Sequence, residues 1–131
     1  MFSQKRKFGN IGEDVAVKKL TELGFVVIDR NYLKKWGEID IVARGTDRIV
    51  RFIEVKTVSR EIIQGKNVKV PHETWRPEDN VHPAKLKRMV RAIETWIADN
   101  ELESEWQIDV ITITLDTARK RGVIKYIENI I

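Results

Sequence analysis

One stretch near the middle of the chain constrains the fold most, because it places ionisable residues inside two apolar runs. The first run, Gly37–Ala43, contains Asp40, and the second, Ile49–Thr57, contains Glu54 and Lys56. Both runs have the composition of strands, and the polar segment between them has the length and glycine content of a hairpin turn. The sequence therefore predicts two antiparallel strands with charged side chains built into them.

The predicted hairpin brings these three side chains together. Side chains alternate between the faces of a strand, so Glu54 and Lys56 point to the same face. Pairing about the turn at Gly45 places Asp40 close to Glu54 across the ladder. Two carboxylates and an ammonium beside an apolar sheet suit a hard cation, Mg²⁺ or Mn²⁺, which polarises phosphate and lowers the pKa of a bound water. The alternative is a hairpin with all three side chains on a solvated face.

The motif formed by Asp40 and Glu54-Val55-Lys56 resembles that of the PD-(D/E)XK nuclease superfamily. The phrases Gly37-Glu38-Ile39-Asp40 and Ile53-Glu54-Val55-Lys56-Thr57 look most like the YraN-type bacterial family, which is similar to archaeal Holliday junction resolvases. The resemblance extends from about Gly9 to Thr114. It implies a metal-dependent endonuclease that hydrolyses DNA phosphodiesters, with branched or structured DNA among the candidate substrates.

The resemblance also implies a role for individual residues. Asp40 and Glu54 would hold the metal ion, and Lys56 would stabilise the charge of the transition state. Glu13 lies in a G-x-x-x-E segment that matches the first-helix glutamate of resolvase-like nucleases, and it would be the third acidic ligand and part of the catalytic site. In the alternative, Glu13 belongs to a capping box that begins at Asn10.

Composition restricts the class of protein. The chain has 131 residues and no cysteine, so we expect one domain, no disulfide and a reducing compartment. No apolar run approaches transmembrane length, and no apolar segment follows the basic start as in a signal peptide. We therefore expect a cytoplasmic protein that is not bound to a membrane. The net charge of +4 comes from clustered lysines and arginines, which suit a polyanion such as DNA.

Five basic residues are the candidates for nucleic-acid contact. Four lie in the first turns of a predicted helix and one in the polar segment that precedes it: Lys85, Lys87, Arg88, Arg91 and Arg60. Lys85 also matches a lysine that the YraN-type family places at this helix start, so the resemblance implies that Lys85 approaches the site. The alternative is that these residues are ordinary solvated charge.

The predicted elements follow the order α-β-β-β-α-β-β. They comprise a helix over Asn10–Leu23, a strand over Phe25–Tyr32, the two strands above, a helix over Pro83–Asn100, and a hairpin of Trp106–Leu115 and Val123–Ile130. The first six match the restriction-endonuclease-like α-β-β-β-α-β core that the resemblance implies, and the last is an extra C-terminal strand. We therefore expect an α/β fold with a mixed central sheet flanked by helices.

Three segments complete the predicted organisation. Residues 1–9 are expected to form a basic flexible arm, residues 10–131 a single nuclease-like domain, and residues 58–82 a long mobile loop. Asp109 stands among apolar residues and matches an aspartate of the family, so we expect it to be a structural partner of a basic side chain.

Two other functions stay open on the sequence alone. One is a non-catalytic nucleic-acid-binding module that retains the nuclease fold, and the other is a protein-interaction domain that uses the sheet edge or an apolar patch. Divalent-ion binding distinguishes the enzyme from both of these. Salt-dependent DNA binding distinguishes the nucleic-acid-binding module from the protein-interaction domain. By analogy with resolvases, which make two nicks in a two-fold junction, the resemblance implies a homodimer.

Overall fold

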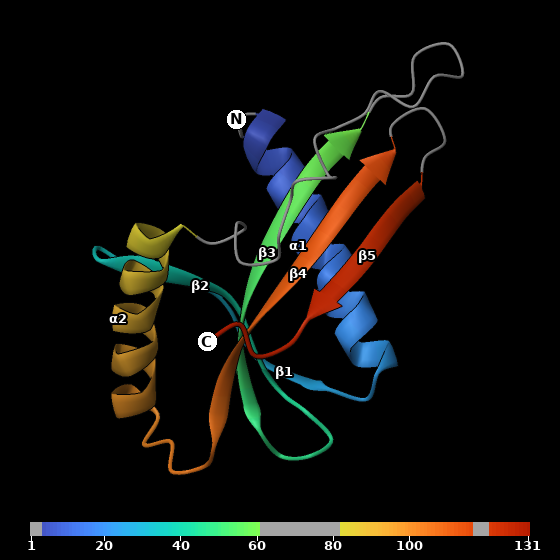
Figure 1. The fold of residues 1–131 in the computed structure, drawn as a ribbon. Helices are drawn as coiled ribbons and strands as arrows, with labels where there is room; N and C mark the ends of the chain where they lie inside the picture. Colours follow the sequence, from blue (N-terminus) through green and yellow to red (C-terminus); the bar gives the residue numbers. More distant parts are fainter. Residues whose placement is uncertain (1–3, 61–81, 117–120) are drawn as a thin grey trace.

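The computed structural model describes residues 4–60, 82–116 and 121–131 (Figure 1). Its elements in chain order are α1 (Gln4–Glu22), β1 (Val26–Lys34), β2 (Gly37–Arg44), β3 (Val50–Arg60), α2 (Pro83–Asp99), β4 (Trp106–Asp116) and β5 (Arg121–Ile127). This is the predicted α-β-β-β-α-β order with one extra strand, so the predicted fold class is confirmed. Neither helix of the described segments combines the length and the apolar character needed to cross a membrane.

The five strands form one mixed sheet in the order β1-β2-β3-β4-β5. β3 and β4 are parallel and pair along their whole length, from Val50 with Trp106 to Arg60 with Asp116. The other three neighbouring pairs are antiparallel. A parallel pair needs a crossover connection, which here contains α2, whereas the antiparallel pairs on either side are joined by short connections.

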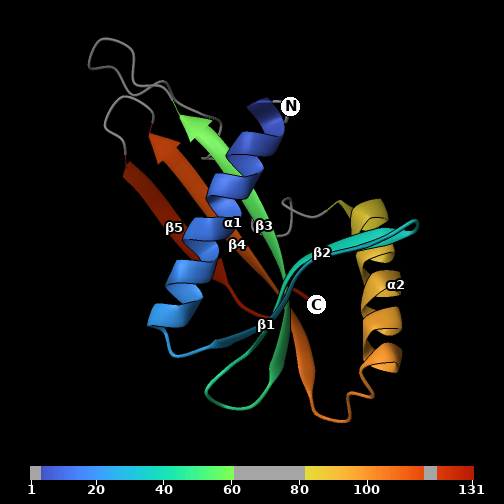
Figure 2. The same ribbon diagram turned by 180° about the vertical axis from the view of Figure 1, so that it is seen from behind.

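The two helices cover opposite faces of the sheet, and successive residues of β3 alternate between them. Phe52 packs with Met89, Ile93 and Trp96 of α2, whereas Ile53 packs with Ala16 and Leu20 of α1. Figure 2 shows α1 lying across β3, β4 and β5 on its face of the sheet. The hydrophobic core is therefore divided by the sheet into two layers, and each layer is closed by one helix.

Helix α1 begins earlier than the sequence indicated. It starts at Gln4, so the predicted helix start at Asn10 is wrong, and Asn10 lies inside the helix instead of capping it. The lysines, arginine and glutamine of residues 4–9 are good helix formers, which favours the longer helix. Gly12 lies inside the helix, where a Cβ would stand 1.8 Å from Thr57 Oγ1. A glycine at this position therefore permits a close approach of α1 to β3.

Strand β3 is longer than expected. Val58–Arg60 were placed in the predicted long loop, but they belong to β3 because they pair with residues 114–116 of β4. At the other end of the loop, His82 caps α2 by accepting a hydrogen bond from the Ala84 amide at 3.2 Å. The rest of that loop, residues 61–81, lies outside the described residues, as do residues 117–120 of the last predicted turn.

The β1–β2 hairpin leaves the sheet and reaches α2. β2 pairs with β3 only as far as Ile41, while it stays paired with β1 to its first residue, Gly37. The free end of the hairpin curves towards α2 (Figure 1). A Cβ on Gly37 would stand 2.1 Å from the backbone oxygen of Arg88, and Trp36 Nε1 donates to Thr95 Oγ1 at 3.3 Å. The hairpin end and the helix are therefore packed backbone against backbone.

This packing predicts that Gly37→Ala destabilises the protein. The atom that the new methyl group meets belongs to the α2 backbone and cannot rotate away, so we expect a loss of about 1–3 kcal/mol in the free energy of unfolding, measured by chemical denaturation. Gly122→Ala is the control, since the closest atom to its Cβ is Leu115 Cδ2 at an ordinary 3.4 Å. Equal stability losses in the two variants would contradict the prediction.

Candidate active site

Asp40 lies at the point where β2 separates from β3. Its Oδ2 accepts a hydrogen bond from the Val55 amide at 2.8 Å. Continued pairing beyond Ile41 and Ile53 would give that amide a backbone carbonyl of β2 as its partner. The carboxylate therefore replaces a strand-to-strand bond, and Asp40 comes to lie beside Glu54, as the hairpin register predicted.

Glu54 is the most buried acid of this region, with 3% of its surface exposed. It stands on the face of β3 that carries Phe52, towards α2, and its Oε1 forms an ion pair with the ammonium of Lys85. Its Oε2 is buried and has no hydrogen-bond partner in the described part of the chain. A buried carboxylate oxygen without a donor is costly, so this atom marks a position suited to a cation.

Glu13 approaches the same region from α1. Burial raises the pKa of Glu13; the positive charge of Arg30 opposes this shift, and the charges of Glu38 and Glu54 add to it. The Glu13 carboxylate therefore interacts electrostatically with Glu54 on β3, although the two residues are far apart in the sequence. The structure thus supports a position for Glu13 at the edge of the carboxylate cluster formed by Glu13, Glu38, Asp40 and Glu54.

Asn31 of β1 is a neighbour that the sequence did not indicate. When the side-chain amide of Asn31 is oriented so that both its oxygen and its nitrogen have suitable partners, the nitrogen donates a hydrogen bond to Glu13 Oε1 at 2.7 Å. Asn31 has a φ of 52°, in the left-handed region that asparagine tolerates better than most residues. The backbone conformation of one strand residue is invisible in a single sequence, which explains why this contact was missed.

The carboxylate cluster carries more negative charge than its described surroundings neutralise. Burial, and next the charge of Glu54, raise the pKa of Asp40 to about 8, although the hydrogen bond from Val55 acts in the opposite direction. The charges of Glu13 and Glu38 contribute to the same rise. Without a further cation, the Asp40 carboxyl therefore keeps a proton near neutral pH, and any cation that binds there competes with this proton.

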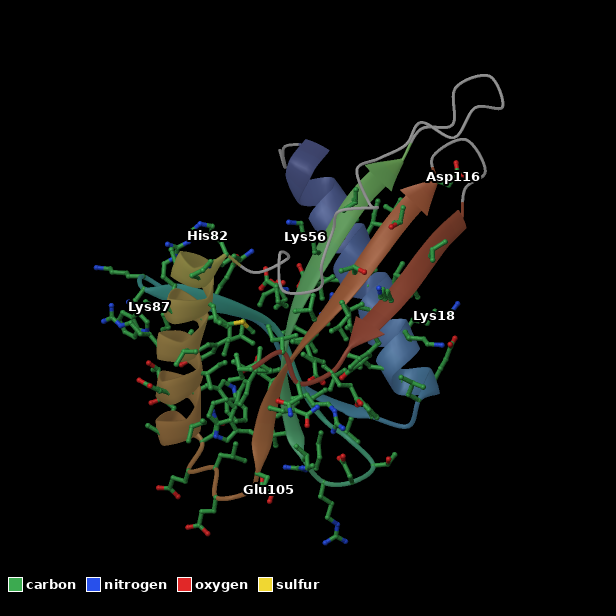
Figure 3. The ribbon with its side chains drawn as sticks, in the orientation of Figure 1. Lys18, Lys56, His82, Lys87, Glu105 and Asp116 are labelled. Carbon is green, nitrogen blue, oxygen red and sulfur yellow. The ribbon has the colours of Figure 1, made fainter. Side chains whose placement is uncertain are left out.

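The structure brings some of the predicted site residues together and leaves others apart. Asp40, Glu54 and Glu13 interact electrostatically, but within residues 4–60, 82–116 and 121–131 no three acidic or histidine side chains converge into a ready-made metal site. Lys56 is exposed on β3, two residues beyond Glu54 (Figure 3). The ammonium that pairs with Glu54 belongs to Lys85 and not to Lys56.

The basic residues predicted for nucleic-acid contact have different environments. Lys85 is engaged with the cluster, the Arg91 guanidinium lies 5.8 Å from the centre of the Trp36 ring, and Lys87 is exposed on the outer side of α2 (Figure 3). Arg60 ends β3, and its side chain lies outside the description. The four α2 residues therefore do not form one uniform solvated face.

Arg88 takes part in a pocket that adjoins the carboxylate cluster. The pocket has a volume of about 280 Å³ and lies between the β1–β2 hairpin and the start of α2. Its charged lining residues are Lys34, Lys35, Glu38, Lys85 and Arg88. Since Glu38 and Lys85 also belong to the surroundings of Asp40, the pocket and the acidic cluster are contiguous.

A second buried charged group lies on the α1 face of the sheet. Asp109 is fully buried, and its Oδ2 lies 3.3 Å from Arg51 Nε. Tyr126 donates its hydroxyl to Asp109, and the Asn129 amide donates at 2.8 Å. The prediction that Asp109 is a structural partner of a basic side chain is confirmed. In contrast to Glu54, this acid has donors on both of its oxygens.

The comparisons with known proteins place the chain among bacterial relatives. The model of the family described as Uncharacterised protein family UPF0102 matches residues 12–113. A UPF0102 protein of Campylobacter jejuni is 34% identical over 122 residues, which cover 93% of this chain and 91% of the relative. One of Helicobacter hepaticus is 32% identical over 125 residues, with coverage of 95% and 94%, and one of Campylobacter concisus is 33% identical over 106 residues, with coverage of 81% and 82%.

The raised pKa of Asp40 predicts a pH dependence of stability in the absence of divalent ions. The folded chain holds the proton of the Asp40 carboxyl more tightly than the unfolded chain, in which the pKa of Asp40 is near its ordinary value of 3.8. The stabilising contribution is therefore complete below about pH 4 and is lost as the pH rises through about 8. We expect the free energy of unfolding in EDTA to fall by about 1 kcal/mol or more between pH 5 and pH 9.

Asp40→Asn isolates this contribution, because asparagine still accepts the hydrogen bond from Val55 but does not titrate. Urea denaturation of both proteins across the pH range measures the difference. A wild-type curve that runs parallel to the Asp40→Asn curve would show that the Asp40 carboxyl does not hold a proton in the folded chain.

Proposed function

The chain belongs to the family UPF0102, and on this basis and that of the site geometry we propose that it is a metal-dependent endonuclease of the PD-(D/E)XK superfamily. Its substrates would be DNA phosphodiesters, with branched or structured DNA among them. The observation that carries the proposal is the pair of carboxylates, Asp40 and Glu54, held together where β2 leaves β3. This pairing explains why two acids are buried between apolar residues of the sheet.

The side chains of the cluster fit Mg²⁺ or Mn²⁺, since hard cations prefer carboxylate oxygens. Asp40 and Glu54 would hold the ion, and Glu13 would be the third acid. Glu54 Oε2 has no hydrogen-bond partner among the described residues, and burial together with the charge of Glu54 raises the pKa of Asp40. Both observations fit a cation at this position. When bound, the ion would polarise the phosphate and lower the pKa of an attacking water.

The protein residues supply position and charge. The hydrogen bond from Val55 fixes the orientation of Asp40, and the contact from Asn31 orients Glu13. Lys56 is exposed beyond Glu54 on the same strand, where its ammonium would stabilise the charge that develops on the phosphate. We assign Lys56 to charge stabilisation, the role that the resemblance to the nuclease motif implies for this lysine.

The basic residues beside the cluster suit the polyanionic substrate. The chain has a net charge of +4, and Lys87 and Arg88 are exposed on α2 near the start of the helix. Phosphate contacts of this kind position a nucleic acid without reading its sequence. A homodimer is part of the proposal by analogy with resolvases, because two symmetrical cuts need two active sites.

A second candidate function is a non-catalytic nucleic-acid-binding module. The observation in its favour is the ion pair between Lys85 and Glu54, which already neutralises one of the two acids. The decisive experiment incubates the protein with a panel of labelled DNA and RNA structures, with and without Mn²⁺. Cleavage that requires Mn²⁺ supports the nuclease, whereas binding with the usual salt dependence and no cleavage supports the module.

Divalent ions should raise the melting temperature, because a ligand that binds only the folded chain stabilises it. At an ion concentration about 100 times the dissociation constant, the expected stabilisation is about 2.7 kcal/mol. Asp40→Asn should remove most of the rise in Mg²⁺ or Mn²⁺, measured by differential scanning calorimetry. Glu94→Gln, which removes an exposed acid on α2, is the matched control and should keep the wild-type rise.

An equal rise in wild type and Asp40→Asn would exclude Asp40 from the ion site. An equal loss in Glu94→Gln would assign the effect to general surface charge.

Lys56→Ala should slow cleavage by about 10²-fold or more, the scale for losing one preorganised stabilising group. Metal affinity and DNA affinity should change little, because Lys56 is exposed and is not a ligand in the proposal. Lys56→Arg should restore only part of the rate, because the planar guanidinium cannot occupy the position of an ammonium. Single-turnover cleavage of the best substrate on the panel gives the rate.

Lys18→Ala is the control for loss of a surface charge, since Lys18 is exposed on α1 and has no role in the proposed site. If Lys56→Ala cleaves as fast as wild type, the assigned role of Lys56 is wrong even where the metal dependence holds.

A further inference from the structure

Lys85 is the residue whose position the proposed function does not explain. Its side chain comes from the first turn of α2 and reaches Glu54 on β3, where the ammonium forms an ion pair with Oε1. The Glu54 side chain is 4% exposed, but that of Lys85 is 41% exposed. One partner of the pair is therefore fixed in the core, while the other extends to it from the surface.

The charges around Lys85 are those of the whole carboxylate cluster. Burial acts to lower the pKa of Lys85, but the hydrogen bond to Glu54 and the charges of Glu54, Asp40 and Glu38 outweigh it and raise the pKa. The ammonium thus contacts Glu54, a proposed metal ligand, and is influenced by the charges of Asp40 and Glu38 without an ion pair to either among the described residues. It supplies part of the positive charge that a divalent ion would supply there.

Lys85 also lines the pocket that adjoins the cluster. Arg88, one turn further along α2, lines the same pocket, together with Lys34 and Lys35 at the end of β1. The backbone contact of Gly37 with Arg88 fixes the hairpin wall of the pocket against the helix wall. A half-exposed lysine on a flexible stem therefore has two sites within its reach, the Glu54 carboxylate and the adjoining pocket, whose charged lining is basic apart from Glu38.

We propose that Lys85 is the built-in counter-cation of the cluster, that a divalent ion displaces it, and that the displaced ammonium joins Arg88 in the pocket to bind a backbone phosphate of the nucleic acid. This inference rests on the proposed function, because it needs a metal ion at Asp40 and Glu54. It adds a phosphate subsite and a coupling between the ion and the substrate.

The coupling follows from electrostatics. Two cations cannot share the buried Glu54 carboxylate without repulsion, so the metal ion binds at the expense of the Lys85 pair. A phosphate in the pocket stabilises the displaced ammonium and lowers this cost. Binding of the ion and of the nucleic acid should therefore strengthen each other, and the effect is reciprocal.

The test removes the ammonium with Lys85→Met and measures two affinities. Without its competitor, Mn²⁺ should bind Asp40 and Glu54 at least about fivefold more tightly in calorimetric titration of the protein alone. DNA should bind at least about fivefold more weakly, with its salt slope reduced by about one, in fluorescence titrations of a labelled duplex and a labelled four-way junction in Ca²⁺. One substitution should thus shift the two affinities in opposite directions.

Lys87→Met is the control for the metal titration. It removes the same charge from the same helix two residues away, at an exposed position, so its Mn²⁺ affinity should stay within about twofold of wild type. Lys85→Arg keeps a cation on Glu54 and should not tighten Mn²⁺ binding. Lys85→Gln replaces Lys85→Met if the methionine variant does not show a cooperative melt in EDTA.

Each outcome decides a separate part of the inference. Unchanged or weaker Mn²⁺ binding in Lys85→Met, with Mn²⁺ bound normally by wild type, overturns the displacement of Lys85 and leaves the proposed function intact. Tighter Mn²⁺ binding with unchanged DNA affinity overturns the phosphate subsite and supports the displacement. Failure of wild type to bind Mn²⁺ with or without DNA overturns the metal site itself, and the inference falls with it.

Discussion

The hydrogen bond from the Val55 amide to Asp40 is the interaction on which the architecture of the site depends. It satisfies a backbone donor that loses its strand partner, so β2 can leave β3 without an unpaired amide in the core. The departure has two effects. It gives Glu54 space to face α2, and it releases the end of the β1–β2 hairpin to pack against that helix. The site and the wall of its neighbouring pocket thus arise from one interruption of the ladder.

The two buried groups of charge in this chain are built in different ways. Around Asp109, a tyrosine, a glutamine and a backbone amide donate hydrogen bonds, an arginine adds an ion pair, and the acid has a structural role. Around Asp40 and Glu54, one lysine faces several carboxylates, and one buried oxygen has no described donor. A fold that satisfies one acid and leaves another under-neutralised stores unfavourable electrostatic energy at the second, and such energy is typical of functional sites.

Much of the fold was predictable because local signals and tertiary packing agree. The alternating and apolar runs gave the strands, the helical spacing of apolar residues gave α2, and the glycine turn set the register that brings Asp40 near Glu54. The start of α1 was not predictable from the cap-like residues at Asn10, because helix-forming residues before them continue the helix. The end of β3 was missed because its last residues gain strand structure only from the parallel partner β4.

The candidate site was predictable to the level of strands but not of side-chain contacts. The acids were found because a carboxylate within an apolar strand is unusual in any sequence. The family resemblance implied that Lys85 approaches the site, but its ion pair with Glu54 depends on how α2 crosses the sheet. Asn31 acts through a left-handed backbone conformation inside β1. Both are properties of tertiary structure, for which spacing along one chain carries no signal.

The parallel pairing of β3 with β4 has a consequence for how the chain folds. Residues 61–105 separate the two strands, so their pairing closes a long segment, whereas the hairpin of β2 and β3 closes over a few residues. Local hairpins form within microseconds, and non-local parallel contacts form later. We therefore expect Asp40 and Glu54 to meet while water still surrounds them, and their mutual repulsion to grow only when α2 and β4 arrive. The final assembly step, and not the first, would then carry the electrostatic cost of the site.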